Sequence, residues 1–492
     1  MAESLKHQTA KGFVWSGLER YSVNFLRFIL GLILARMLSP TDYGLIGMIT
    51  IFLAISQTIV DSGFSSALVQ KKEKTETDYS TAFYFNIIVG LVLYIVLYIS
   101  APLIADFFNE QQLVSITRIV GINVFISSLA IVQRAKLIIK IDFKTQAKVN
   151  IISVLLSGII GISMAYKGYG VWSLVIQSIS RRSLQTFLLW KFAKWRPSKH
   201  FSYSSFIQLF SFGSRILGSG LLNTIFDNVY LLVIGKGFST SDLGFYTRAK
   251  QFSDLPSINF TSIFHRVSYP TLCKVNITSP KKLNEAFRKF VRLASFVTFP
   301  FMISLIILAK PLIIVTLTEK WIQSVEFLQI ICLSGIWFPI SAVNMNIFSV
   351  IGNTKIVLKL TIIKKIITVI ILAITIPLGI KALLWGQVIM AIINYLITII
   401  QSSKYSKYSL KDQIFDLSIL VAYNIPLIIT GILCSYIIRD PLTLTIVSIP
   451  LMITIHIFTV KLLNVPEWNE LETMLISLKK SHRNKSSKEH QN

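Results

Sequence analysis

Long apolar stretches alternate with short polar segments over most of the chain, from Gly12 to Val460. About twenty consecutive apolar residues are needed to cross the hydrocarbon core of a bilayer as a helix. A window of that length predicts about fourteen spanning helices. The predicted spans lie near residues 12–37, 43–70, 80–105, 114–135, 146–166, 170–192, 206–235, 242–272, 285–317, 323–350, 356–377, 380–402, 413–437 and 442–462. The pattern therefore indicates an all-α, polytopic membrane protein.

The loops between these spans alternate in charge. The basic set holds Lys6, Lys11, Lys71, Lys72, Lys74, Lys136, Lys140, Lys144, Lys191, Lys194, Arg196, Lys199, Lys274, Lys281, Lys282, Lys355, Lys404, Lys407, Lys411 and the C-terminal tail. No loop of the other set carries more than one Lys or Arg; these are residues 39–42, 105–112, 167–169, 236–242, 318–321, 377–381 and 439–441. Because short basic loops stay on the cytoplasmic side, both termini are expected in the cytoplasm of a bacterial inner-membrane protein.

A sequence repeat divides the spans into two sets. The segment that begins at Arg27 is followed 200 residues later by a similar segment that begins at Asp227. The matched positions are Ser39 and Ser239, Asp42 and Asp242, and Gly44 and Gly244. Both copies have the S-x-x-D spacing of a helix-capping box. A weaker match pairs residues 168–172 with 379–383.

The repeat predicts two six-helix lobes related by a pseudo-two-fold repeat, followed by an extra helix pair. The expected parts are an N-lobe (residues 1–192), a cytoplasmic linker (193–205), a C-lobe (206–402), helices thirteen and fourteen (413–462) and a basic cytoplasmic tail (463–492). Duplicated halves with a substrate path between them are typical of secondary transporters.

Composition excludes several other classes. Of the 492 residues 53% are hydrophobic and 15% charged, with 49 Lys and Arg against 23 Asp and Glu, a net charge of +26. The excess lies in loops on one predicted side of the membrane, so it is an orientation signal rather than a nucleic-acid footprint. Neither Cys273, Cys332 and Cys434 nor the six histidines have the spacing of a metal site. No metal, cofactor or nucleic acid is expected.

The first predicted span contains three charged residues, Glu19, Arg20 and Arg27. Each costs about 2.5–3.5 kcal/mol near the centre of a bilayer, so the three cost about 8–10 kcal/mol together. About a dozen Leu, Ile, Phe and Val residues offset only about 4–7 kcal/mol of this. The helix is therefore expected to face protein or a water-filled cavity. Arg20 and Arg27 are two turns apart and share one face of it.

Further charged residues fall in spans two, seven and eight, and they are Asp61, Arg215, Asp227, Arg248, Lys250 and Asp254. A cavity lined by arginines suits an anionic, phosphate-bearing substrate, because guanidinium groups bind phosphate bidentately. We predict that the substrate-binding residues are Arg20, Arg27, Arg215 and Arg248. Glu19, Asp61, Asp227 and Asp254 are either their charge partners or groups for ion coupling. Some of these charges could instead be structural ion pairs or snorkel to the interface; Arg181 and Arg182 are expected to be interfacial anchors.

Several segments resemble one family. They are K-G-F-V-W-S-G-L-E-R (residues 11–20), A-R-M-L-S-P-T-D-Y-G-L-I-G-M (35–48), Y-T-R-A-K-Q-F-S-D-L-P (246–256), R-V-S-Y-P-T-L (266–272), L-T-E-K-W (317–321) and G-N-T-K (352–355). Together they resemble polysaccharide exporters of the colanic-acid-exporter type, in the superfamily that also holds multidrug (MATE) exporters and the lipid II flippase. Where that family often has Gly in L-x-G-E-K-W, this chain has Thr318.

The resemblance implies a two-lobed, V-shaped transporter with a cationic central cavity. It would flip undecaprenyl-diphosphate-linked oligosaccharide to the periplasmic leaflet by alternating access, and its partners would be that substrate and membrane lipids. A multidrug antiporter of the same superfamily is the alternative, although carboxylates would then be expected to dominate the cavity. A polysaccharide polymerase or ligase would need a large periplasmic loop, and a channel would not need two unlike lobes. The chain is therefore predicted to be no enzyme, while the coupling ion and any association with a polymerase or chain-length regulator stay open.

Overall fold

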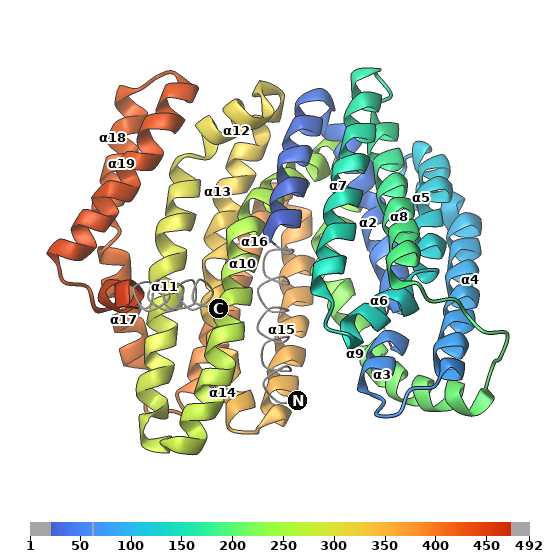
Figure 1. The fold of residues 1–492 in the computed structure, drawn as a ribbon. Coiled ribbons are helices and arrows are strands. Elements are labelled where there is room, and N and C mark those ends of the chain that lie inside the picture. The colour runs from blue at the N-terminus through green and yellow to red at the C-terminus, as the bar shows by residue number, and fades with distance from the viewer. Residues whose placement is uncertain (1–20, 62, 474–492) are drawn as a thin grey trace, which may run out of the picture. The chain divides into compact units, whose positions relative to one another are not determined.

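A computed structural model describes residues 21–61 and 63–473, and within these ranges every regular element is a helix (Figure 1). The contacts divide the chain into two compact units, residues 1–247 and residues 248–492. We call them the N-terminal unit and the C-terminal unit and describe each by itself. The predicted all-α fold class is confirmed.

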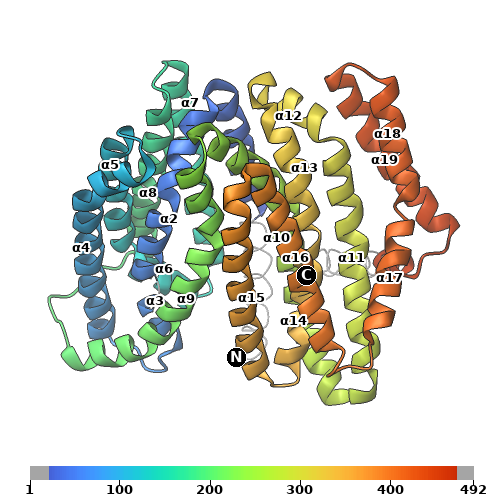
Figure 2. The same ribbon diagram turned by 180° about the vertical axis from the view of Figure 1, so that it is seen from behind.

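The N-terminal unit begins with a helix over residues 21–37. It continues with α2 (Pro40–Asp61), α3 (Phe64–Gln70), α4 (Glu76–Phe108), α5 (Gln112–Ser128), α6 (Ile131–Ile139), α7 (Phe143–Tyr166), α8 (Val171–Ala193), α9 (Tyr203–Gly237) and the start of α10 (Thr240–Thr278). Helix α4 packs along α5, α7 along α8 and α2 along α9 (Figures 1 and 2). An aromatic core in this unit contains Phe64 on α3, Tyr79 and Phe83 on α4, and Trp195 after α8.

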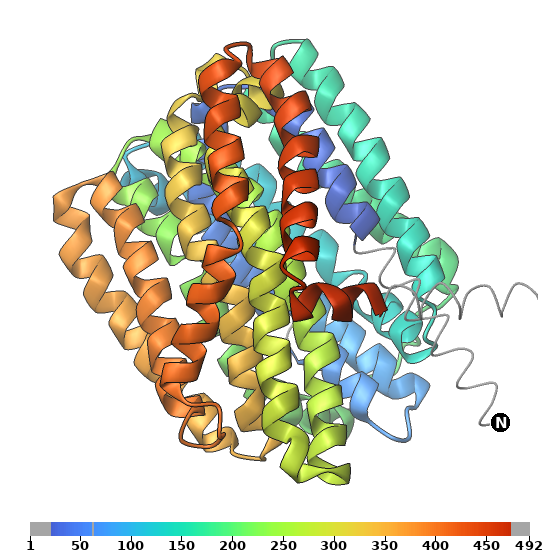
Figure 3. The same cartoon turned by 90° about the vertical axis from the view of Figure 1, so that its left-hand side faces the viewer.

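The C-terminal unit contains the remainder of α10, α11 (Leu283–Ile307), α12 (Ala309–Leu317), α13 (Gln323–Gly335), α14 (Trp337–Val350), α15 (Thr354–Thr375), α16 (Ile380–Ser402), α17 (Leu410–Ala422), α18 (Ile425–Ile437) and α19 (Pro441–Leu462). Residues 466–473 form one more short helix. Helices α18 and α19 are an antiparallel pair (Figure 3). The core of the unit is formed by α11, α14 and α16, with Phe287, Ile347 and Phe348 fully buried.

Each predicted span corresponds to a helix or to consecutive helices, apart from the first, of which only residues 21–37 are described. Within the described residues, nine helical segments are long and apolar enough to cross a membrane, or ten if α5 and α6, which bend by 42°, count as one. The four remaining predicted spans are the charged ones, which hold Arg27, Arg181 with Arg182, Arg248, and the lysines of α15. The number fourteen stays a prediction.

The two repeat copies form matching caps. The backbone N–H groups of Ser39 and Ser239 each donate to the carboxylate three residues on, at 2.8 Å to Asp42 and 3.2 Å to Asp242. The backbone N–H of each aspartate donates back to its serine at 3.2 and 3.1 Å. These reciprocal bonds are the capping boxes that the S-x-x-D spacing predicted, and they begin α2 and α10.

The repeat copies also touch each other, in a reciprocal way. A Cβ added to Gly44 would lie 1.8 Å from the carbonyl oxygen of Thr240, and a Cβ added to Gly244 would lie 1.9 Å from that of Pro40. Residue 44 therefore contacts residue 240 in the same way as residue 244 contacts residue 40. Only glycine permits so close a backbone approach, which explains why both copies carry it. We call this pair of contacts the glycine clasp.

The contact division differs from the predicted lobes. It places α9 and the start of α10 with the N-terminal unit, because α9 packs along α2 and the glycine clasp joins α2 to α10. A second backbone crossing adds to this, since a Cβ on Gly63 would lie 2.3 Å from the Cα of Gly213. The predicted lobes at residues 1–192 and 206–402 stay a prediction.

Candidate functional site

The predicted site residues fall into three groups. Glu19 and Arg20 lie outside the described residues. Arg27 and Asp61 lie in the N-terminal unit, where further arginines surround them. Arg215 and Asp227 lie on α9, and Arg248 and Asp254 lie on α10.

Arg181 and Arg182 lie at the middle of α8, which runs from Val171 to Ala193. At 1.5 Å per residue, Arg181 is about 18 Å from the last residue of the helix. Both side chains are half-buried. They were expected near the cytoplasmic end of the span, because their charge was assigned to the basic loop that follows, but the helix continues for about three more turns after Arg182. Their role as interfacial anchors stays a prediction.

Four arginines and one aspartate interact within the N-terminal unit. Arg181 is within range of the charges of Arg27 and Arg182. Arg182 in turn interacts with Arg134, Asp61 and Arg27. Arg134 Nη1 lies 3.8 Å from Asp61 Oδ1, which is a loose ion pair. We call these five residues the arginine cluster.

The arginine cluster is assembled from four helices. Arg27 comes from the helix of residues 21–37, Asp61 is the last residue of α2, Arg134 lies on α6, and Arg181 and Arg182 lie on α8. Helix α8 contacts both α2 and α6. None of the five residues is near another in sequence except the two on α8, so the fold alone brings them together.

Polar side chains support the arginines on α8. Arg182 Nη1 donates to Gln185 Oε1 at 3.4 Å, and Gln185 Nε2 donates to Asn150 Oδ1 on α7 at 2.6 Å. On the same helix as Asn150, α7, Gly158 approaches Leu30 so closely that a Cβ there would lie 2.5 Å from a Leu30 methyl group. Helix α7 therefore connects the helix that carries Arg27 to the helix that carries Arg182.

The balance of charge shows what the arginine cluster can bind. The cluster as defined holds four guanidinium groups and one carboxylate, so it carries a net positive charge, and its residues lie in predicted membrane spans. A charge in this environment costs about 2.5–3.5 kcal/mol when it is not compensated, and the like charges repel one another as well. An anion with several oxygen atoms would relieve both costs, because each arginine offers a planar fork of N–H donors.

Helix α9 exposes most of its surface. Its buried residues are Leu209, Gly213, Leu231, Ile234 and Gly235. The side chains of Arg215 and Asp227 are both exposed. Nearby, the rings of Tyr230 on α9 and Tyr246 on α10 stack with centroids 6.5 Å apart. An arginine such as Arg215 would not face lipid without cost, so its position is compatible with the predicted role, which stays a prediction.

On α10, Lys250 Nζ pairs with Asp254 Oδ2 at 2.8 Å, one helical turn away. Arg248, two residues before Lys250, is half-buried. Asp254 thus has a cation partner within its own helix, whereas the partner of Asp61 is Arg134 on another helix, α6. Whether either carboxylate also couples an ion stays a prediction.

Two lysines on α15 were not among the site residues predicted from the sequence. Lys364 and Lys365 occupy the eleventh and twelfth of its 22 positions, the middle of a predicted span, and both are half-buried. The signal was visible, since the reasoning applied to Arg20 and Arg27 applies equally to two lysines between apolar residues. They are further candidate cations, in the C-terminal unit.

A second group of charged residues was also not predicted from the sequence, and its arginines and carboxylates pair with one another. Arg288 donates twice to Asp416, at 2.7 and 2.8 Å, and Arg292 donates to the same carboxylate at 2.9 Å. Arg292 also pairs with Glu467, and the hydroxyl of Tyr408 donates to Asp416 at 2.7 Å. Burial and the neighbouring Asp416 raise the pKa of Tyr408, so it remains a donor. We call these five residues the paired network.

Sequence comparison decides the family. The model of a family described as polysaccharide biosynthesis proteins matches residues 33–326, which is more than half of the chain. The chain belongs to this family.

No group of three or more His, Cys, Asp or Glu that could hold a metal ion occurs among the described residues.

Three relatives illustrate the range of the family. The chain is 27% identical over 336 residues to the teichuronic acid biosynthesis protein TuaB of Bacillus subtilis (strain 168), covering 68% of this chain and 69% of TuaB. It is 22% identical over 339 residues to the lipopolysaccharide biosynthesis protein WzxC of Escherichia coli (strain K12), covering 68% of each. It is 26% identical over 329 residues to the succinoglycan biosynthesis transport protein ExoT of Rhizobium meliloti (strain 1021), covering 66% of each.

Solved structures share the fold of this family member. The lipid II flippase MurJ in an inward closed conformation aligns with a TM-score of 0.73 at 15% identity, over 92% of this chain and 98% of MurJ. An inward-facing MATE multidrug transporter aligns with a TM-score of 0.59 at 14% identity, over 79% and 98%. The protein is a multi-pass membrane protein, and the predicted resemblance is confirmed.

Proposed function

We propose that this protein is a flippase that moves undecaprenyl-diphosphate-linked oligosaccharide from the cytoplasmic to the periplasmic leaflet, for assembly of a surface polysaccharide. Transport rather than chemical conversion is its role, by alternating access. The observation that carries the proposal is the arginine cluster, in which Arg27, Arg134, Arg181 and Arg182 lie together with Asp61.

Membership of the polysaccharide biosynthesis family supports this substrate class. The relatives are named for teichuronic acid, lipopolysaccharide and succinoglycan, and one of them is named a transport protein. A diphosphate linker gives such different sugars one common anionic group. Guanidinium forks recognise that group without regard to the sugar.

The charge of the arginine cluster argues against an exporter of cationic drugs. Cations bind where carboxylates dominate, and four arginines against one aspartate would repel them. The basic loops support an orientation with both termini in the cytoplasm. With that orientation, a cysteine at position 41 should react with an impermeant reagent from the periplasm, and a cysteine at position 72 only after the membrane is opened.

The proposal is tested by charge removal in the arginine cluster. Arg27→Ala, or Arg181→Gln with Arg182→Gln, should lower surface polysaccharide to about a tenth or less, because each lost cation weakens phosphate binding by more than 1 kcal/mol. Membrane abundance should stay near normal, since removal of a repelled charge costs little. The control is Arg118→Gln on α5, whose guanidinium lies over the ring of Tyr98 and outside the cluster. Full export by the cluster variants would reject the proposal.

A further inference from the structure

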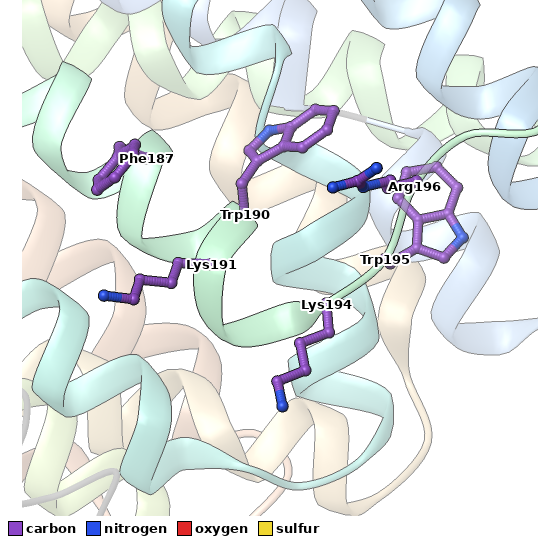
Figure 4. A pocket seen from close by; sticks show the side chains of 6 residues that line it. All are labelled: Phe187, Trp190, Lys191, Lys194, Trp195 and Arg196. Carbon is purple, nitrogen blue, oxygen red and sulfur yellow. The ribbon is translucent and has the colours of Figure 1, made fainter.

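A pocket of about 670 Å³ lies where α8 ends and the linker to α9 begins. Figure 4 shows Phe187, Trp190 and Lys191 on the helix, and Lys194, Trp195 and Arg196 on the segment that follows. Three aromatic and three cationic side chains form its lining. It is separate in sequence from Arg181 and Arg182, which lie more than one turn earlier on α8.

The aromatic wall of the pocket is held in place. Trp190 Nε1 donates to the carbonyl oxygen of Leu129 at 2.8 Å, and Trp195 Nε1 donates to Glu76 Oε2 at 2.6 Å. The ring of Phe83 meets both indoles edge-on, with centroids 5.7 Å apart in each case. The indole N–H groups are therefore already used, and the rings can offer a ligand only their faces and edges.

The linker is fixed as well. The backbone N–H of Ser198 donates to Ser80 Oγ at 2.9 Å, and that of Ser202 donates to Thr81 Oγ1 at 3.0 Å. These bonds attach the linker to the first turns of α4. Trp195 and Arg196 are thus preset beside the end of α8, so little ordering entropy would be lost on binding.

The cations of the pocket have no carboxylate partner. Lys191, Lys194 and Arg196 are exposed and form no ion pair with any residue in the described part of the chain. The nearest acid of the aromatic wall, Glu76, is already bound by Lys136 at 2.9 Å and by Trp195. Part of this charge complements the negative end of the α8 dipole, but three cations exceed what one helix end needs.

The lining changes in polarity along one helix face. Phe187, Trp190 and Lys191 are spaced i, i+3 and i+4 and so share one side of α8, and Lys194 directly follows the last residue of the helix. Phe187 is 66% exposed and lies farthest from the linker along the chain, followed by Trp190 and then by the lysines next to the linker. An apolar-to-cationic order fits an amphiphile, with its chain at Phe187 and its phosphate at Lys194 and Arg196. A free phosphate would have no use for the aromatic half.

We propose that this pocket is a docking site for the diphosphate of an isoprenyl lipid in the cytoplasmic leaflet, where the lipid-linked substrate is first held before it reaches the arginine cluster. The inference rests on the proposed function and on the predicted orientation. A diphosphate diester carries two negative charges in adjacent groups, which matches three cations better than the single charge of a glycerophospholipid. An isoprenyl chain matches the exposed Phe187.

The test is equilibrium binding of radiolabelled farnesyl diphosphate to the full-length protein in a neutral detergent. Lys191→Gln, Lys194→Gln and Arg196→Gln together should weaken binding about a hundredfold, at about 1 kcal/mol per cation. The matched control removes the same charge from the exposed Lys274, Lys281 and Lys282, which belong to another predicted cytoplasmic loop. It should change binding less than about twofold. Equal losses in both variants would show diffuse attraction and overturn the proposal.

Phe187→Ser tests the apolar half without disturbing the core, because Phe187 is exposed. It should weaken farnesyl diphosphate but leave inorganic pyrophosphate unchanged. Phosphatidylglycerol should compete poorly; competition as strong as that of unlabelled farnesyl diphosphate would reassign the pocket to bulk phospholipid and overturn the proposal. A benzophenone-bearing isoprenyl diphosphate should crosslink within residues 187–196, and labelling elsewhere alone would contradict it.

The binding measurement and the export assay test the two proposals independently of each other. Arg181→Gln with Arg182→Gln should abolish export and leave pocket binding intact, because the cluster and the pocket are different groups. Loss of pocket binding in the Lys191, Lys194 and Arg196 variant, with export reduced several-fold rather than abolished, is the expected pattern for a first docking site. Unchanged export together with unchanged binding in that variant would reject the pocket and leave the proposed function standing.

Discussion

Arginines inside membrane helices occur in both units, and their surroundings differ. In the paired network of the C-terminal unit, Arg288 and Arg292 are matched by Asp416 and Glu467. In the arginine cluster of the N-terminal unit, four arginines lie beside one aspartate, Asp61, within the described residues. The first arrangement pairs two arginines with two carboxylates, which is a structural arrangement. The second brings cations together, which is the arrangement that we propose binds a substrate.

The paired network joins distant parts of its unit. Both arginines lie on α11, Asp416 lies on α17, and Glu467 belongs to the short helix after α19. The buried Asp416 accepts from two arginines and from Tyr408. The network therefore fixes α17 and the end of the described chain on α11.

The largest expected effect breaks the paired network. Asp416→Asn should destabilise the protein by about 3–5 kcal/mol, because it leaves two arginines facing each other without their common partner. Thermal unfolding in detergent, followed by size-exclusion chromatography, measures the loss. The matched control is Glu326→Gln, whose exposed pair with Lys381 at 2.9 Å should contribute no more than about 0.5 kcal/mol. Equal melting temperatures for the two variants would contradict the structural role.

The second-largest expected effect concerns the glycine clasp of the N-terminal unit. Gly44→Val or Gly244→Val places carbon atoms against the backbone of the other repeat copy, and each should destabilise by about 1–3 kcal/mol. The two variants should behave alike, since the contacts are equivalent. Gly218→Val on α9 is the control, because nothing lies within 4 Å of a Cβ there. Unchanged thermal stability of both the Gly44→Val and the Gly244→Val variant would contradict the structural role of the glycine clasp.

The smallest effect is stabilising. Thr318 has φ 86° and ψ 170°, a backbone conformation that is nearly restricted to glycine. Thr318→Gly should therefore stabilise the C-terminal unit by about 1 kcal/mol. Thr316→Gly, two residues earlier in α12, should instead destabilise it by about 0.5–1 kcal/mol. A lower melting temperature for Thr318→Gly would show that the strain is compensated elsewhere.

Local features could be predicted from the sequence, and long-range pairings could not. The capping boxes at Ser39 and Ser239 depend on four consecutive residues, and each was predicted correctly. The helical spans follow from apolar length, which explains why they agree with the helices closely. Position 318 is also a local feature. The family often has glycine there, and the backbone of Thr318 adopts a conformation that favours glycine.

The arginine cluster and the paired network required the fold. Asp416 lies 124 residues from Arg292, and no local pattern connects them. Arg181 and Arg182 were expected near the end of their span and lie at its middle, and a window of hydropathy shows that a charge is present but not which helix it faces. Arg134 was overlooked for the same reason, since it belongs to the short helix after a 42° bend.

The glycine clasp has a consequence for the symmetry of the chain. A contact in which one surface meets its own copy, with position 44 against 240 and 244 against 40, is isologous, the arrangement found at the two-fold axis of a homodimer. A covalent chain has no need of that symmetry, but an assembly of two identical six-helix polypeptides would form it automatically. The clasp therefore has, within a single polypeptide, the local two-fold symmetry of a homodimer interface, so each of its two contacts places the same steric limit on the other copy.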